Sequence, residues 1–190
     1  VSPSVIDIER YGIDPPSEDG PFTVGWIGSP TSQGQLETIR PVLEEHLAAG
    51  GRVTTVGATS SVLEGMDVDR QPWSEATEVA HIRSFDVGIM HLTDTPWRRG
   101  KCGFKLIQTM AVGRPVISSP VGVNVEIGEG TGGGQLAESH DDWRVALQEF
   151  RGSPELRKTL GERGYLAVRD RYSVQAILPH LERALRSAVA

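Results

Sequence analysis

The stretch Phe104-Lys-Leu-Ile-Gln-Thr-Met-Ala-Val-Gly-Arg-Pro-Val-Ile117 places a helix and a β-strand on either side of one glycine. A helix is predicted over residues 104–112, and Gly113 ends it, because glycine readily adopts the left-handed conformation that closes helices. Residues 114–119, Arg-Pro-Val-Ile-Ser-Ser, then predict a strand. The stretch is therefore one helix-to-strand unit of a larger alternating pattern.

The same alternation is found upstream of this unit. Residues 85–92 are apolar enough for a central strand, and a polar loop is predicted over 93–102. Further strands are predicted over 22–28, 52–57 and 67–72, and helices over 36–47 and 75–83. Alternating strands and helices imply the α/β class and a Rossmann-like, doubly wound parallel sheet with right-handed crossovers.

The remaining sequence predicts helices at one end and a linker at the other. A glycine-rich segment at 128–134 and a short strand at 135–137 precede helices over 141–150, 154–172 and 174–188, with Ser139 and Ser153 as caps of the first two. Residues 1–21, rich in Pro, Ser, Asp and Glu, are interpreted as a linker from a domain upstream. Residues 22–190 form the predicted domain, without internal repeats.

Composition restricts the class of protein. With 190 residues, 38% of them hydrophobic and 23% charged, the chain fits one packed, enzyme-like soluble domain. A net charge of -6 without any cluster of basic residues argues against nucleic-acid binding. Cys102 is the only cysteine, which favours a reducing cytoplasm. No apolar run approaches the roughly 18 to 20 residues of a membrane-spanning helix, and no signal peptide is evident.

Ligands of doubly wound sheets bind beyond the carboxyl ends of the strands, where three loops qualify: 28–34, 71–74 and 98–105. The first, Gly28-Ser-Pro-Thr, offers small residues and hydroxyls to a phosphate but lacks the dinucleotide fingerprint. Gly57-Ala-Thr stands where an NAD site needs an acidic residue, so a dehydrogenase is not expected. The alternative for the first loop is a tight turn that binds nothing.

The third loop combines four cations, two glycines and a helix start, which together suit a diphosphate. The cations are Arg98, Arg99, Lys101 and Lys105. A solvated basic loop beside a core helix is an alternative that accounts for the first three. It accounts less well for Lys105, which enters the helix.

Residues 104–117 resemble the helix, glycine and Gly-x-Pro-Val-Ile pattern in the C-terminal domain of group 1 retaining glycosyltransferases of the GT-B fold. The resemblance runs from Val5 onward. It includes Gly25-Trp-Ile-Gly-Ser-Pro30, Pro72-Trp-Ser74, Phe85-Asp-Val-Gly-Ile-Met90 and Ser119-Pro-Val-Gly-Val-Asn-Val-Glu126.

The resemblance implies that the chain is the donor-binding half of a hexosyltransferase-like enzyme, inactive as an isolated domain. It implies a nucleoside diphosphate sugar as donor substrate, with no further cofactor. The acceptor would be held by an N-terminal domain absent here, and peripheral membrane association of the full-length protein is a further expectation. The implied donor-binding residues are Gly28 and Ser29 near the diphosphate, Gln71 and Trp73 near the base, Gly103, Phe104 and Lys105 near the phosphates, and Gln108 near the ribose.

Two positions depart from the family pattern. Many members carry a Glu, seven residues and a second Glu, where this chain has Gly100 and Gln108. Gln108 can still form hydrogen bonds with a ribose, but without charge. Gly100 offers nothing to a hydroxyl of the donor, so either Arg99 or Lys101 takes its place, the loop shifts, or the chain belongs to a branch that is organised differently. No catalytic residue is assigned. A non-catalytic nucleotide-binding or assembly module is therefore the alternative function, followed by phosphate-ester or epimerase chemistry.

Four other polar residues are weighed as site candidates. His91 is expected to be a hydrogen-bonded strand-end residue rather than a catalyst. Glu126 and Asn124 either face the cleft or stand at a helix start, and Cys102 lacks the His partner of a nucleophilic thiol. No close spacing of His and acidic residues predicts a metal site, and Asp67-Val-Asp69 lies on a strand. Metal independence is expected.

Overall fold

The computed structural model describes residues 3–14 and 20–189, which contain a six-stranded parallel sheet with the order β3-β2-β1-β4-β5-β6. The strands are β1 (Thr23–Ile27), β2 (Arg52–Val56), β3 (Val68–Gln71), β4 (Val87–Met90), β5 (Val116–Ser118) and β6 (Gly134–Leu136). The predicted doubly wound α/β class is confirmed. The strand order reverses between β1 and β4, and this switch point is where open α/β sheets form a crevice for ligands.

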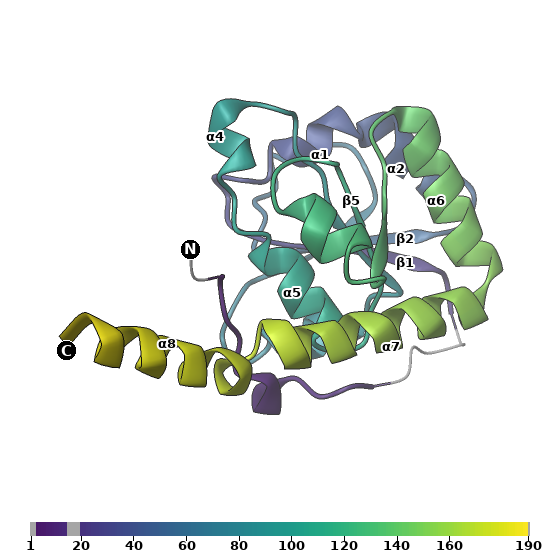
Figure 1. The fold of residues 1–190 in the computed structure, drawn as a ribbon. Helices are drawn as coiled ribbons and strands as arrows, with labels where there is room; N and C mark the ends of the chain where they lie inside the picture. Colours follow the sequence, from purple (N-terminus) through teal and green to yellow (C-terminus); the bar gives the residue numbers. More distant parts are fainter. Residues whose placement is uncertain (1–2, 15–19, 190) are drawn as a thin grey trace.

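Helices cover both faces of the sheet. They are α1 (Gln35–Thr38), α2 (Arg40–Ala48), α3 (Glu78–Arg83), α4 (Pro96–Arg99), α5 (Phe104–Met110), α6 (His140–Gly152), α7 (Pro154–Arg171) and α8 (Val174–Val189), with a 3₁₀ turn η1 (Ile8–Arg10) and a π-helical turn η2 (Val125–Glu129). Figure 1 shows α7 crossing the foot of the molecule and α8 continuing away from its body. Within the described ranges, none of the helices has the length and apolar character needed to cross a membrane.

The two faces of β1 pack into different parts of the core. Val24 and Trp26 belong to a buried cluster with side chains of α1, α2 and α6, whereas Ile27 belongs to a second cluster with side chains of α3 and α5. Gly25 leaves room for the ring of Phe85, which a Cβ at that position would overlap. The alternation of a strand thus supplies both halves of the core.

The predicted elements are confirmed with local differences. The predicted single helix over 36–47 divides into α1 and α2, because Pro41 in the first turn of α2 has no N–H for a continuous helix. The predicted polar loop over 93–102 contains α4, whose first turn is capped by Thr95. The last strand lies one residue earlier than predicted. Ser139 and Ser153 cap α6 and α7 as predicted.

The described part of the predicted linker packs against the domain. Ile6 and Tyr11 are buried, and the N–H of Ile6 donates to the carbonyl of Tyr172 at 2.8 Å. The buried guanidinium of Arg114 donates to the carbonyl of Asp14. That residues 1–21 join this domain to another one stays a prediction, but residues 3–14 complete the core of this domain.

Candidate functional site

A cavity of about 470 Å³ opens at the carboxyl ends of β1, β2 and β4, at the switch point of the sheet. It is lined by Ile27, Gly28, Ser29, Pro30, Gly57, Trp73, Glu78, Met90, Lys101, Cys102, Gly103, Phe104, Lys105 and Gln108. All of the predicted donor-binding residues except Gln71 are in this set. The Gln71 side chain instead donates to Asp69 Oδ1 at 2.6 Å, so the structure leaves it outside the cavity.

One wall of the cavity consists of backbone brought close to a lysine. The side chain of Lys105 passes directly over Gly28, where an added Cβ would lie 2.5 Å from Lys105 Cε and 2.6 Å from the Trp26 ring. Gly57 has a φ of +81°, and a Cβ there would overlap the carbonyl oxygen of Gly28. Only glycine at these positions lets the two loops and the lysine meet.

The start of α5 forms the neighbouring part of the same wall. Gly103 precedes the helix in the left-handed conformation, with a φ of +66°. Among the residues that the structure describes, no side chain caps this helix start. A helix start carries partial positive charge and uncapped N–H groups, which favour a bound anion.

Lys105 brings a full positive charge to this wall. Its side chain is half-buried, and Nζ lies 5.7 Å from the centre of the Trp26 ring. Burial lowers the pKa of Lys105, and the positive charge of Lys101 lowers it further. In the described part of the chain, no carboxylate lies within ion-pair distance of Nζ. A partly desolvated cation without a counterion is a ready partner for phosphate oxygens.

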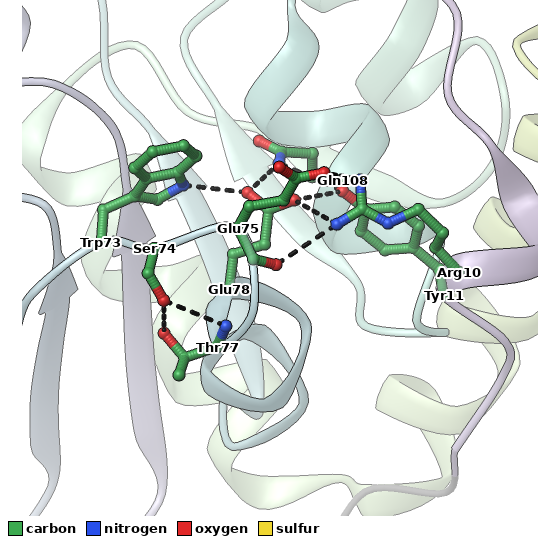
Figure 2. A network of polar contacts seen from close by, with 8 residues as sticks. All are labelled: Arg10, Tyr11, Trp73, Ser74, Glu75, Thr77, Glu78 and Gln108. Atoms are coloured by element: carbon green, nitrogen blue, oxygen red, sulfur yellow. Dashed lines mark hydrogen bonds and ion pairs between the residues drawn. The ribbon is translucent and has the colours of Figure 1, made fainter.

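Another wall of the cavity is a network of hydrogen bonds around one buried carboxylate (Figure 2). Glu78, at the start of α3, is 6% exposed. Its Oε2 accepts from Trp73 Nε1 at 2.9 Å and from Gln108 Nε2 at 3.2 Å. Its Oε1 accepts from the Tyr11 hydroxyl at 3.1 Å. The network fixes the positions of two predicted site residues, Trp73 and Gln108.

Tyr11 stays a donor in this network at physiological pH. Its burial, together with the nearby charge of Glu78, raises the pKa of Tyr11 to about 12. The hydroxyl also accepts from Gln108 Nε2 at 3.3 Å. The Gln108 amide nitrogen therefore donates to both Glu78 and Tyr11.

Glu78 was not among the residues predicted from the sequence, although a signal was present. Glu78 and Ile82 are four residues apart and so share one face of α3. Ile82 is fully buried. A carboxylate on the apolar face of a helix needs hydrogen-bond donors from other elements, and here Trp73, Gln108 and Tyr11 provide them.

Comparison with known proteins identifies the fold through structure alone. No protein-family model and no curated protein matches the sequence. Sucrose-phosphate synthase from Thermosynechococcus elongatus superposes with a TM-score of 0.73 and 18% identity over 98% of this chain and 52% of that one. The C-terminal domain of the glycosyl transferase group 1 family protein LpcC from Francisella tularensis gives 0.64 and 18% over 89% of this chain and 99% of that one. This chain has the fold of a group 1 glycosyltransferase C-terminal domain.

A third structure with this fold was solved with ligands. Anabaena HepE in complex with UDP and glucose superposes with a TM-score of 0.75 and 15% identity over 96% of this chain and 55% of that one. The chain thus spans about half the length of sucrose-phosphate synthase and of HepE. The glycosyltransferase fold predicted from residues 104–117 is confirmed, and the cavity lies at its switch point.

The two departures from the family pattern lie in different surroundings in this glycosyltransferase fold. Gln108 is buried in the cavity wall. Gly100 ends α4 and lines a neighbouring cavity of about 340 Å³, together with Glu126 and Tyr172. Glu126 accepts from the Tyr172 hydroxyl at 3.3 Å and does not line the cavity that holds Lys105. Gly100 and Glu126 therefore line a neighbouring cavity, which shares Lys101 and Cys102 with the cavity that holds Lys105.

His91, Asn124 and Cys102 differ in their relation to the cavity. His91 lies outside it against Trp143, and burial lowers the pKa of His91 to about 4. Asn124 is fully buried and donates to the carbonyl of Ser119. Cys102 lines the cavity; burial raises its pKa, but hydrogen bonds from Ser4 and the Phe104 backbone outweigh burial, so the pKa lies below its ordinary value.

The described residues were also compared with the requirements of a metal site. Within 3–14 and 20–189, no group of three or more His, Cys, Asp and Glu side chains could hold a metal ion. Metal independence of the reaction stays a prediction, because phosphate oxygens of a bound substrate can themselves ligate a cation.

Proposed function

We propose that this chain is the donor-binding domain of a retaining, hexosyltransferase-like glycosyltransferase, and that its cavity binds a nucleoside diphosphate sugar. The observation that carries the proposal is the Lys105 ammonium, which is half-buried beside Gly28 and without a carboxylate partner in the described chain. A diphosphate would complete this wall with the charge that it lacks.

The orientation of the donor follows from the two walls. The diphosphate would lie at Lys105, Gly28, Ser29 and the start of α5, where positive charge and open backbone meet. The nucleoside would lie between Trp73 and Gln108, where the wall is polar and already hydrogen-bonded. The complexes of HepE with UDP and UDP-glucose support a nucleotide as the ligand of this fold.

The chemistry expected of this domain is stabilisation of a leaving group. When the bond between the sugar and the diphosphate breaks, negative charge grows on the departing phosphate oxygen. The ammonium of Lys105 and the N–H groups at the start of α5 would interact more strongly with this charge in the transition state than with the donor in the ground state. The acceptor would be held by a separate N-terminal domain, so this chain alone would bind the donor without transferring the sugar.

The setting of the full-length enzyme follows from the same proposal. The single exposed cysteine fits a cytoplasmic enzyme. Peripheral membrane association of the full-length protein stays a prediction. The calorimetry described below identifies the base and the sugar of the donor.

A non-catalytic nucleotide-binding or assembly module is a second candidate function, and Gly100 is the observation that favours it. Gly100 presents no side chain, and it lines the cavity next to the proposed donor cavity. Binding of a nucleotide sugar without turnover in the full-length protein, tested with a broad set of acceptors, would favour this module. Turnover with any acceptor would contradict it.

Calorimetry with UDP, GDP, ADP and their sugar conjugates tests the proposed function. We expect one nucleoside diphosphate and its sugar conjugate to bind. Circular dichroism of the same sample should confirm that the protein is folded. Absence of heat from every nucleotide, with the domain folded, would contradict the proposed function.

A further inference from the structure

The donor cavity contains a single carboxylate, and it belongs to α3. Among the residues that line the cavity, Glu78 is the only Asp or Glu. Its side chain is 7% exposed, and both of its oxygens accept hydrogen bonds from neighbours in the network. Burial disfavours the charged form of a carboxylate, and the hydrogen bonds from Tyr11, Trp73 and Gln108 offset that cost.

The effect of this carboxylate is to orient the amide of Gln108. Gln108 Nε2 lies 3.2 Å from Glu78 Oε2 and 3.3 Å from the Tyr11 hydroxyl (Figure 2). The amide nitrogen is the donor and the amide oxygen is the acceptor. Since the nitrogen faces Glu78, the remaining Oε1 is the acceptor that Gln108 offers, and among the described residues it has no donor.

The pairing also explains why an amide occupies position 108. A carboxylate at this position would place an oxygen within hydrogen-bond distance of Glu78 Oε2, at the present position of Nε2. Two buried carboxylates this close cannot both be ionised. An ionised Glu78 therefore requires a neutral hydrogen-bond donor at position 108.

The segment before the sheet holds Glu78 in place. Arg10 Nη1 forms an ion pair with Glu75 Oε1 at 3.0 Å, and Arg10 Nη2 lies 3.8 Å from Glu78 Oε1. The Tyr11 hydroxyl donates to the same oxygen of Glu78. Residues 10 and 11 thus support the carboxylate from the side opposite to Trp73, as Figure 2 shows.

We infer that Glu78 is a positioning residue that makes Gln108 a hydroxyl acceptor, so that the pair recognises the 2′- and 3′-hydroxyls of a nucleoside diphosphate. The inference rests on the proposed function. Glu78 orients and polarises the Gln108 amide, and Gln108 Oε1 accepts from the ligand. The carboxylate on α3 thus acts on the ligand indirectly, by polarising the amide on α5.

An exchange of the two side chains tests this inference. The variants are Glu78→Gln, Gln108→Glu and the double variant with both changes, and the probes are UDP, GDP and ADP, each paired with its 2′,3′-dideoxy analogue. The readout is the ratio of the two dissociation constants within each pair. This ratio cancels changes in phosphate binding and in overall charge.

We expect the natural chain to bind the diol form about tenfold more tightly than its dideoxy analogue, the size of a hydrogen bond to a charge-supported acceptor. Each single variant should lower the ratio to about twofold or less, because the amide loses its orientation or two carboxylates compete. The double variant, which restores one carboxylate and one amide, should recover most of the ratio. The affinities for the dideoxy analogues should stay similar in all four proteins.

A tenfold ratio retained in Glu78→Gln, or no recovery in the double variant, would overturn the inference. If a single variant does not fold, Tyr11→Phe replaces it, since this change removes the hydroxyl that contacts both Glu78 and Gln108. A folded Tyr11→Phe protein should show a reduced ratio, and an unchanged ratio would overturn the inference equally. If no nucleotide binds the natural chain, the proposed function itself fails.

Discussion

The two walls of the donor cavity use opposite strategies. The lysine wall, formed by Gly28, Gly103 and Lys105, leaves a cation without a carboxylate in the described chain and a helix start without a side-chain cap. The carboxylate wall, formed by Trp73, Glu78 and Gln108, is already hydrogen-bonded. The difference would let one cavity bind a charged group and a neutral, hydroxylated group, as the proposed function requires. The ammonium of Lys105 would attract the charged group, and the fixed orientation of the Gln108 amide would select the hydroxylated group.

Replacing Lys105 by Ala should produce the largest effect, because it removes the charge of the lysine wall. We expect diphosphate binding to weaken by about 1.5–3 kcal/mol, the range of a charge-assisted hydrogen bond. UDP and inorganic pyrophosphate should lose affinity together in calorimetry, since both carry the diphosphate that Lys105 is proposed to bind.

The matched control for Lys105→Ala is Lys158→Ala. Lys158 is an exposed lysine of α7 and does not line the cavity, so its loss changes the net charge by the same amount. Its affinities should equal those of the natural chain. Equal affinities in a folded Lys105→Ala protein would remove this residue from the site.

Replacing Gly28 by Ala should disturb the lysine wall by steric overlap rather than by loss of charge. The new Cβ would lie 2.5 Å from Lys105 Cε and 2.6 Å from the Trp26 ring. We expect a loss of about 1–3 kcal/mol in the free energy of unfolding, as in overpacked cores, together with weaker binding of pyrophosphate. Urea unfolding and calorimetry measure the two effects.

Gly34→Ala is the control for Gly28→Ala, because it lies in the same loop with nothing within 4 Å of an added Cβ. It should change neither stability nor pyrophosphate binding appreciably. If both variants behaved alike, flexibility of the loop rather than the close approach of Lys105 would explain the need for glycine.

Replacing Trp73 by Phe should give the smallest effect, confined to the carboxylate wall. The change keeps an aromatic ring but removes the N–H that donates to Glu78 Oε2 at 2.9 Å. We expect UDP binding to weaken by about 1 kcal/mol, the net value of one hydrogen bond, and pyrophosphate binding to stay the same. A parallel loss with pyrophosphate would mean that the two walls are not independent.

The lysine wall could be predicted from the sequence because its signals are local. A helix start with Gly103 before it and Lys105 inside it stands within three consecutive residues. In the carboxylate wall, Trp73 and Gln108 were predicted from the resemblance, but Glu78 and its network were not. Tyr11 is 97 residues from Gln108 and 67 from Glu78, and Glu78 is 30 residues from Gln108, so they meet only through the fold. A hydrogen-bond network across such separations leaves no spacing pattern.

The fold was predictable for a related reason. The strands β1 and β4 are short, mostly apolar runs and β2 is rich in the β-branched residues Val and Thr, and each strand is nearly or fully buried. Breaks within helices and short helices in loops were less predictable, as the break between α1 and α2 and the short α4 show. Gln71 illustrates the limit at the site: it stands at the correct strand end, yet its side chain bonds to Asp69 instead of lining the cavity.

A crystal structure of this chain grown with UDP, GDP or ADP, chosen by calorimetry, tests the central claim most directly. We predict the diphosphate within hydrogen-bond distance of Lys105 Nζ, beside Gly28 and the start of α5, and the ribose hydroxyls at Gln108 Oε1. A nucleotide in the reverse orientation, with its phosphates against Glu78, or bound outside the cavity, would contradict the division of the cavity into a charged wall and a hydroxyl-binding wall.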